Sequence, residues 1–209
     1  MATPITHIAL AEKVFEKHFL HFQRADFYIG SVFPDIRYLG VIERHQTHVF
    51  NVSLSDVTSA SSAFRAGVLY HCLVDEMRER FVSGRGIYDL CPVSKFTPTA
   101  IKLFEDELYF PHVRDWQNIG SMFDTLLTEE LSYDISREAI EKWHGMVKKY
   151  CKQVPTPMSV EVFAIGAMQE QAIADEINSL IVQIKNISEV QKIALDFWNQ
   201  FDDLIVSKQ

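Results

Sequence analysis

Apolar residues recur along most of this chain at the three- and four-residue spacing of an α-helix. The two-residue alternation that marks a half-buried β-strand never persists. Both observations predict an all-α protein. The apolar spacing and the capping residues place its helices at residues 8–22, 63–81, 97–108, 136–151, 159–184 and 188–205.

The 209 residues can bury a substantial core, and we expect a single compact multi-helix domain over residues 1–209. A proline-containing break at 153–159 divides it into residues 1–152 and a C-terminal helical hairpin, residues 153–209, packed on them. Residues 26–51 are expected to be mostly irregular but buried. Within them, Pro34 should disfavour helix at Phe33 and hold Asp35 in an extended loop or turn.

The charge balance restricts the classes of partner. The net charge of −8 argues against a protein that binds polymeric nucleic acid or anionic membranes, because either surface requires a basic face. A small phosphoester bound beside a metal ion remains compatible, since the ion supplies positive charge. The N-terminal stretch has neither a basic region nor an uninterrupted apolar run, which predicts a cytoplasmic protein without a signal peptide or transmembrane segment.

One predicted helix, 63–81, carries three residues suited to a metal site. Gly67, His71 and Asp75 are four residues apart and therefore share one face. Glycine permits close approach of another helix, while an imidazole and a carboxylate one turn apart can bind one metal ion. In the structural alternative, Asp75 pairs with Arg78 or another cation and His71 is a hydrogen-bonded core residue. The spacing alone is compatible with both.

Further polar residues occur among apolar neighbours in the first fifty positions. Asp35 follows Pro34, and His48 lies thirteen residues later, within reach of a chain that folds back. His45 is three residues before His48, so we expect one of the two to be a ligand and the other to face solvent or support the ligands. His7 stands at the start of the first helix, where a single histidine is usually a surface residue.

In their order along the chain, TH (6–7), GSVFPD (30–35), His48 and GxxxHxxxD (67–75) resemble the zinc-dependent phospholipase C family. The same superfamily contains the single-strand-specific nucleases of fungi and plants. The resemblance covers roughly residues 1–80. It implies an all-helical fold with up to three zinc ions, which activate water for phosphoester hydrolysis.

The resemblance also implies roles for individual residues. Asp35, His48, His71 and Asp75 match the ligands of one zinc ion, and Asp75 matches a bridge to a second ion that would also bind His7. Asp35 matches a residue that is both a ligand and a proposed general base. The family has further ligands downstream, but residues 76–86 contain no histidine, and His112 and His144 lack the HxxxE pattern and are expected at the surface. One or two zinc ions, or another divalent transition metal, are therefore expected.

Two functions remain open. The first is a metal-dependent hydrolase of a small phosphoester, such as a phospholipid head group, a nucleotide or another phosphodiester, with metal-activated water as the nucleophile. The second is a non-catalytic helical binding or scaffold protein that keeps one structural metal or none. The sequence leaves the substrate and the oligomeric state open.

Overall fold

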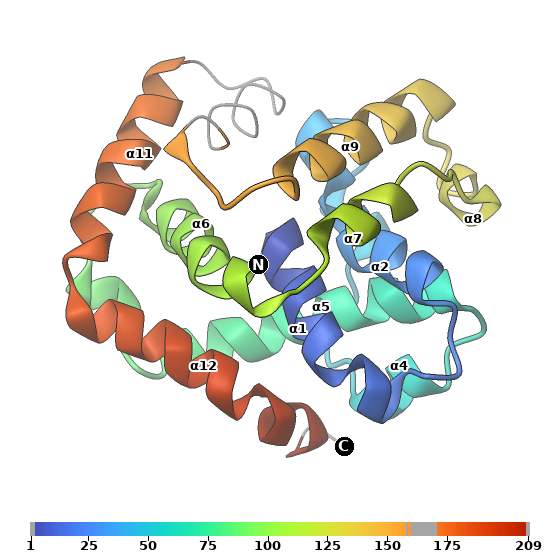
Figure 1. The fold of residues 1–209 in the computed structure, drawn as a ribbon, viewed down its shortest axis with the longest axis horizontal. Coiled ribbons are helices and arrows are strands. Elements are labelled where there is room, and N and C mark those ends of the chain that lie inside the picture. Colours follow the sequence, from blue (N-terminus) through green and yellow to red (C-terminus); the bar gives the residue numbers. More distant parts are fainter. Residues whose placement is uncertain (1–2, 158, 160–170, 208–209) are drawn as a thin grey trace.

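The computed structural model describes residues 3–157, 159 and 171–207, and within these ranges every regular element is helical (Figure 1). The all-α prediction is therefore confirmed. No described helix is long and apolar enough to cross a membrane. The α-helices are α1 (Pro4–His18), α2 (Arg24–Val32), α3 (Arg44–Thr47), α4 (Leu54–Thr58), α5 (Ala63–Ser83), α6 (Thr97–Tyr109), α7 (Trp116–Met122), α8 (Thr128–Leu131), α9 (Arg137–Tyr150), α11 (Gln171–Lys185) and α12 (Ser188–Ser207). The 3₁₀-helices are η1 (Phe33–Leu39), η2 (Ile87–Leu90) and η3 (Phe110–His112).

Aromatic residues fill the core between α1, α2 and α5. Phe19 of α1's C-terminal end stacks on Phe27 of α2 at 4.8 Å between ring centroids, and both rings contact Tyr70 of α5. These side chains are fully buried and belong to one continuous apolar core. Because their burial removes large apolar surfaces from water, it stabilises the packing of α2 on α1 and α5, the two helices that carry His7, His71 and Asp75.

Residues 26–51 are mostly helical, so the prediction of an irregular segment is wrong, although its first half is buried as expected. The backbone of Phe33 is right-handed helical, with φ −57° and ψ −41°, even though Pro34 follows it. Pro34 lies in the first turn of η1, where a residue needs no N–H to continue the helix. Asp35 consequently sits in a buried 3₁₀-helix and not in an extended loop.

Helices α2 and α5 cross in direct backbone contact at two glycines. A Cβ atom on Gly67 would lie 2.1 Å from the carbonyl oxygen of Phe27, and one on Gly30 would lie 2.1 Å from that of Phe64. Neither glycine can therefore carry a side chain at this separation. The predicted close approach at Gly67 is confirmed, and it places the end of α2 beside His71, one turn further along α5.

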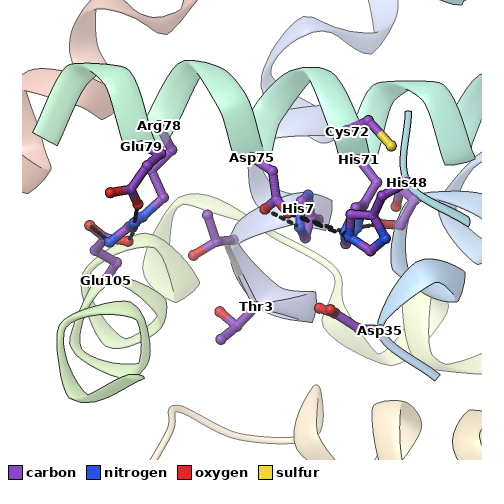
Figure 2. Close-up of polar contacts among 12 residues, drawn as sticks. Thr3, His7, Asp35, His48, His71, Cys72, Asp75, Arg78, Glu79 and Glu105 are labelled. Atoms are coloured by element: carbon purple, nitrogen blue, oxygen red, sulfur yellow. Dashed lines mark hydrogen bonds and ion pairs between the residues drawn. The ribbon is translucent and has the colours of Figure 1, made fainter. Parts of the chain in front are cut away.

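A buried ion pair connects α5 to α6 (Figure 2). Arg78 donates from Nε and Nη2 to the two carboxylate oxygens of Glu105, at 2.5 and 2.8 Å, and both side chains are fully buried. The alternative in which Arg78 neutralises Asp75 is therefore wrong. Arg78 lies one turn beyond Asp75 on the same face of α5, so its pairing with Glu105 leaves Asp75 directed at the histidines.

A second buried carboxylate fastens the start of α1 to α6. Asp106 accepts hydrogen bonds from the hydroxyl of Thr3, from the backbone N–H of Thr6 at 2.9 Å, from the Thr6 hydroxyl at 2.7 Å and from the Tyr150 hydroxyl at 2.7 Å. These bonds satisfy an acid that is completely buried. They also hold the first turn of α1, and with it His7, against α6.

Asp106 should make stability depend on pH. Burial raises its pKa from 3.8 to about 6 despite the hydrogen bonds, so between these values the folded chain retains a proton that the unfolded chain has lost. The wild type should therefore lose stability relative to Asp106→Asn as pH rises, by about 2 kcal/mol between about pH 4.5 and about pH 7. Urea unfolding of both proteins at the two pH values measures this difference, and an equal response of the two would contradict it.

The C-terminal helices pack on different neighbours. The described part of the predicted helix 159–184 is α11, which lies along α6, while residues 160–170 of that prediction lie outside the described residues. After Asn186 the chain turns sharply into α12, which packs on α5, α1 and α6 (Figure 1). These two helices thus meet at an angle, and the expected C-terminal hairpin is not formed between them.

Candidate metal centre

All five residues predicted as ligands meet in the interior of the protein (Figure 2). His7 comes from the first turn of α1, Asp35 from η1, and His48 from the residue that follows α3. His71 and Asp75 project from the same face of α5. Each of the five is at most 6% exposed. For His7 this excludes the surface role that its sequence position alone suggested.

The distances between their donor atoms match those between ligands of one metal ion. Nε2 of His71 lies 3.3 Å from Nε2 of His48 and 3.5 Å from Oδ2 of Asp75, and the His48–Asp75 distance is 3.8 Å. Atoms that bind one tetrahedral zinc at about 2.0–2.2 Å lie about 3.3–3.6 Å apart. The two sets His48, His71, Asp75 and His7, Asp35, His71 each offer donor atoms within 4.8 Å of one another.

Two contacts orient the imidazoles. Nδ1 of His71 lies 2.9 Å from the backbone carbonyl of Ser31, and it must carry the proton to donate to that oxygen. In the neutral ring, Nε2 then presents its lone pair to Asp75 and His48. The Thr47 hydroxyl lies 3.0 Å from Nδ1 of His48 and can accept from it in the same way. Such contacts to the remote nitrogen are typical of metal-binding histidines.

The electrostatics of the site favour neutral imidazoles at His48 and His71. Burial and the charge of His7 hold the pKa of His71 well below its usual value. Burial and the nearby Arg44 lower the pKa of His48 to about 4. Burial opposes ionisation of Asp75, but His71 and His7 outweigh it and hold the pKa of that carboxyl well below 3.8. Neutral imidazole and ionised carboxylate are the protonation states that bind a metal.

Asp35 lies across the histidines from Asp75, and burial together with the charge of Asp75 raises its pKa to about 6. Among the described residues neither of its oxygens has a hydrogen-bond partner, and its nearest cation is Nη2 of Arg37 at 3.6 Å. Both ring nitrogens of His7 also lack a hydrogen-bond partner within the described part of the chain, although Nε2 is 3.5 Å from Asp75.

This lack of hydrogen bonds contrasts with the buried acids and the buried histidine outside the cluster. Asp106 accepts four hydrogen bonds, Glu105 is held by Arg78, and His144 lies 2.7 Å from Glu130. Leaving a buried polar group unsatisfied costs about 1–3 kcal/mol, and more for a charged one. A cation bound between the carboxylates and the imidazoles would satisfy these groups, so the donor set fits a metal ion. Three imidazoles and two carboxylates suit zinc, and also iron, nickel or copper.

The remaining histidines lie outside the cluster. His45 is exposed, which confirms that one of the pair His45 and His48 faces solvent. His112 is exposed and stacks on Trp198 at 4.5 Å, as expected of a surface residue. The expected surface role of His144 is wrong, because this residue is buried against Glu130. Its spacing from later acids could not reveal that pairing, since Glu130 precedes it on another helix.

A surface hollow of about 340 Å³ borders the cluster on the side of His48 and Asp75. It is also lined by residues that the motifs did not single out: Arg44, Val49, Phe50, Cys72, Glu76, Glu79 and Arg80. Arg44 begins α3, the short helix that ends directly before His48. This proximity to His48 in the sequence is the signal that could have identified Arg44 as a residue of the site. The hollow gives the buried centre a route to solvent and a place for a ligand.

No protein-family model, curated protein or solved structure matches this chain significantly. The arrangement of the donor atoms and the order of the motifs along the chain are therefore the observations that bear on its function.

Proposed function

We propose that this protein is a metal-dependent hydrolase of small phosphoesters that binds one or two zinc ions through His7, Asp35, His48, His71 and Asp75. The observation that carries the proposal is the buried convergence of these five side chains with ligand-like spacing. The resemblance of their motifs to zinc-dependent phospholipase C supplies the expectation of a phosphoester as substrate.

Different residues of the chain can serve different roles in phosphoester hydrolysis. Zinc lowers the pKa of coordinated water towards neutrality and polarises phosphoryl oxygens. Among the described residues neither carboxylate oxygen of Asp35 has a hydrogen-bond donor, so this side chain could accept a proton from water and would also help to hold an ion. Ser31 and Thr47 hold the imidazoles of His71 and His48 in place. Burial of the cluster excludes bulk water from all but the side facing the hollow.

One observation favours the alternative of a binding or scaffold protein. In residues 3–157, 159 and 171–207, no histidine, cysteine or acid beyond these five joins the groups that could hold a metal. The phospholipase C family implies more ligands than these five. A site with five ligands is compatible with one structural metal as well as with catalysis.

Metal binding can be tested by comparing alanine substitutions of two neighbouring histidines, His48 in the cluster and His45 at the surface. Protein loaded with zinc and then desalted should retain at least one equivalent in the wild type and in His45→Ala, whose side chain is exposed. His48→Ala and Asp75→Ala should lose most of it, because each removes a donor from the same triad. Elemental analysis measures the content, and circular dichroism verifies that the variants are folded. Equal zinc in wild type and His48→Ala would contradict the site.

An assay of phosphoester hydrolysis distinguishes the hydrolase from the binding or scaffold protein. Zinc-loaded wild type should hydrolyse bis-p-nitrophenyl phosphate or the head group of phosphatidylcholine, and removal of zinc by a chelator should abolish the activity. Asp35→Asn should reduce kcat far more than it reduces zinc content, because an amide cannot take the proton. Stoichiometric zinc without turnover on these substrates would favour the scaffold and refute the hydrolase.

A further inference from the structure

Acidic and basic side chains both line the hollow beside the candidate metal centre, but they differ in whether they already have partners within the protein. Its two glutamates already have donors: Glu76 binds Arg80 at 2.9 Å and the backbone N–H of Asn51 at 3.2 Å. Glu79 accepts from the hydroxyls of Ser83 and Tyr88 and lies 3.5 Å from Arg78. Both glutamates therefore already have hydrogen-bond donors within the protein, and Glu76 also has a cationic partner.

Arg44 differs from the other charged residues of the hollow. Within the described part of the chain, no carboxylate lies within ion-pair distance of its guanidinium. It stands one turn before His48, whose backbone N–H bonds to the Arg44 carbonyl, so the cation borders the metal-ligand cluster. In a protein with a net charge of −8, such an uncompensated arginine beside a buried centre is a local site for an anion.

Phe50 forms the outer wall next to this arginine. Its ring is 75% exposed and lies 5.8 Å from the guanidinium carbon of Arg44, within the range of a cation–π contact. This contact restricts the guanidinium without using its N–H donors, which remain available to a ligand. At about 340 Å³, the hollow has the size of the smallest ligand pockets and suits a compact molecule.

We propose that Arg44 binds the phosphoryl oxygens of a small phosphoester in this hollow and positions the phosphorus beside His48 and Asp75. The inference rests on the proposed function and names the residue that recruits its substrate. A guanidinium presents two parallel N–H donors that match two phosphoryl oxygens, which a single ammonium group cannot do. The same contact would bind inorganic phosphate, the product of monoester hydrolysis.

Calorimetric titration of zinc-loaded, desalted protein with inorganic phosphate tests the inference. We expect Arg44→Met to bind phosphate about tenfold more weakly than wild type, as for the loss of one charged hydrogen-bonding partner, with unchanged zinc content. Arg44→Lys should recover only part of the affinity, since it restores the charge but not the fork. Arg114→Met, which removes an exposed arginine away from the hollow, should bind as wild type does.

The outcomes distinguish this inference from the proposed function. Equal phosphate affinity of wild type and Arg44→Met, or no phosphate binding by the wild type, would overturn the role of Arg44 whether or not the protein is a hydrolase. A tenfold difference would support it even if the wild type shows no turnover, in which case only the hydrolase proposal fails. With turnover, Arg44→Met should raise KM about tenfold and change kcat little, as for a residue that binds substrate and transition state alike.

Discussion

Replacing Gly67 with alanine should destabilise the protein by about 3 kcal/mol or more, because the new Cβ has no space. It would lie 2.1 Å from the carbonyl oxygen of Phe27 and 2.7 Å from the backbone nitrogen of Ser31, and backbone atoms cannot move aside as a flexible side chain can. The better helix propensity of alanine offsets only about 1 kcal/mol of this. The expected fall in Tm is about 6–12 °C, measured by thermal unfolding.

Gly145 provides a matched control inside another helix. A Cβ there meets nothing within 4 Å, and the residue is exposed in α9. Gly145→Ala should therefore stabilise the protein by about 0.5–1 kcal/mol through helix propensity alone. If Gly67→Ala raises Tm as Gly145→Ala does, the backbone contact between α2 and α5 is not as close as described. Because Ser31 orients His71, folded Gly67→Ala should also bind zinc more weakly than Gly145→Ala.

Replacing Arg78 with methionine should cost about 3–5 kcal/mol, because it leaves the carboxylate of Glu105 buried without its partner. Both side chains are fully buried, so water cannot replace the lost hydrogen bonds. Urea denaturation of wild type and Arg78→Met measures the free energy of unfolding. The double variant Arg78→Met/Glu105→Leu should recover most of the loss, since it removes both charges from the interior.

A surface ion pair serves as the comparison. Arg137 and Glu141 are one turn apart in α9, with 3.6 Å between their charged atoms and 59% of each side chain exposed. Arg137→Met should therefore change stability by no more than about 0.5 kcal/mol. Arg78→Met and Arg137→Met could lower the free energy of unfolding by similar amounts, or the double variant could be as unstable as Arg78→Met. Either result would show that burial of the ion pair does not determine how much stability its loss removes.

These two contacts lie on either side of His71 and Asp75, the candidate metal ligands of α5. The glycine crossing brings Ser31 and η1 to His71, and the Arg78–Glu105 pair removes the cation that would otherwise compete for Asp75. Between them, the carboxylate of Asp75 lies 3.5–3.8 Å from the imidazoles of His7, His48 and His71. The packing that stabilises the fold therefore also leaves this carboxylate available to a metal ion.

Part of the fold could be predicted from local patterns. The helices α5, α6, α9 and α12 follow their apolar periodicity, and Ser136 caps α9 as expected, accepting from the N–H of Ala139. The first helix overlaps its predicted range of 8–22 but begins and ends four residues earlier, at Pro4 and His18. The helical backbone around Pro34 could not be predicted in this way, because a proline in the first turn is compatible with a helix as well as with a loop. Likewise, the burial of His144 depends on Glu130 of a different helix.

For the candidate site, the residue types and their spacing within α5 were set by the sequence itself, because i and i+4 share a face on any α-helix. The sequence also determined the all-α class and the glycine at the helix crossing. Only the tertiary structure decided that Arg78 pairs with Glu105 and that Arg44 lines the hollow. Each of these depends on contacts between helices distant in the chain, and local periodicity carries no information about which of several possible partners a side chain meets.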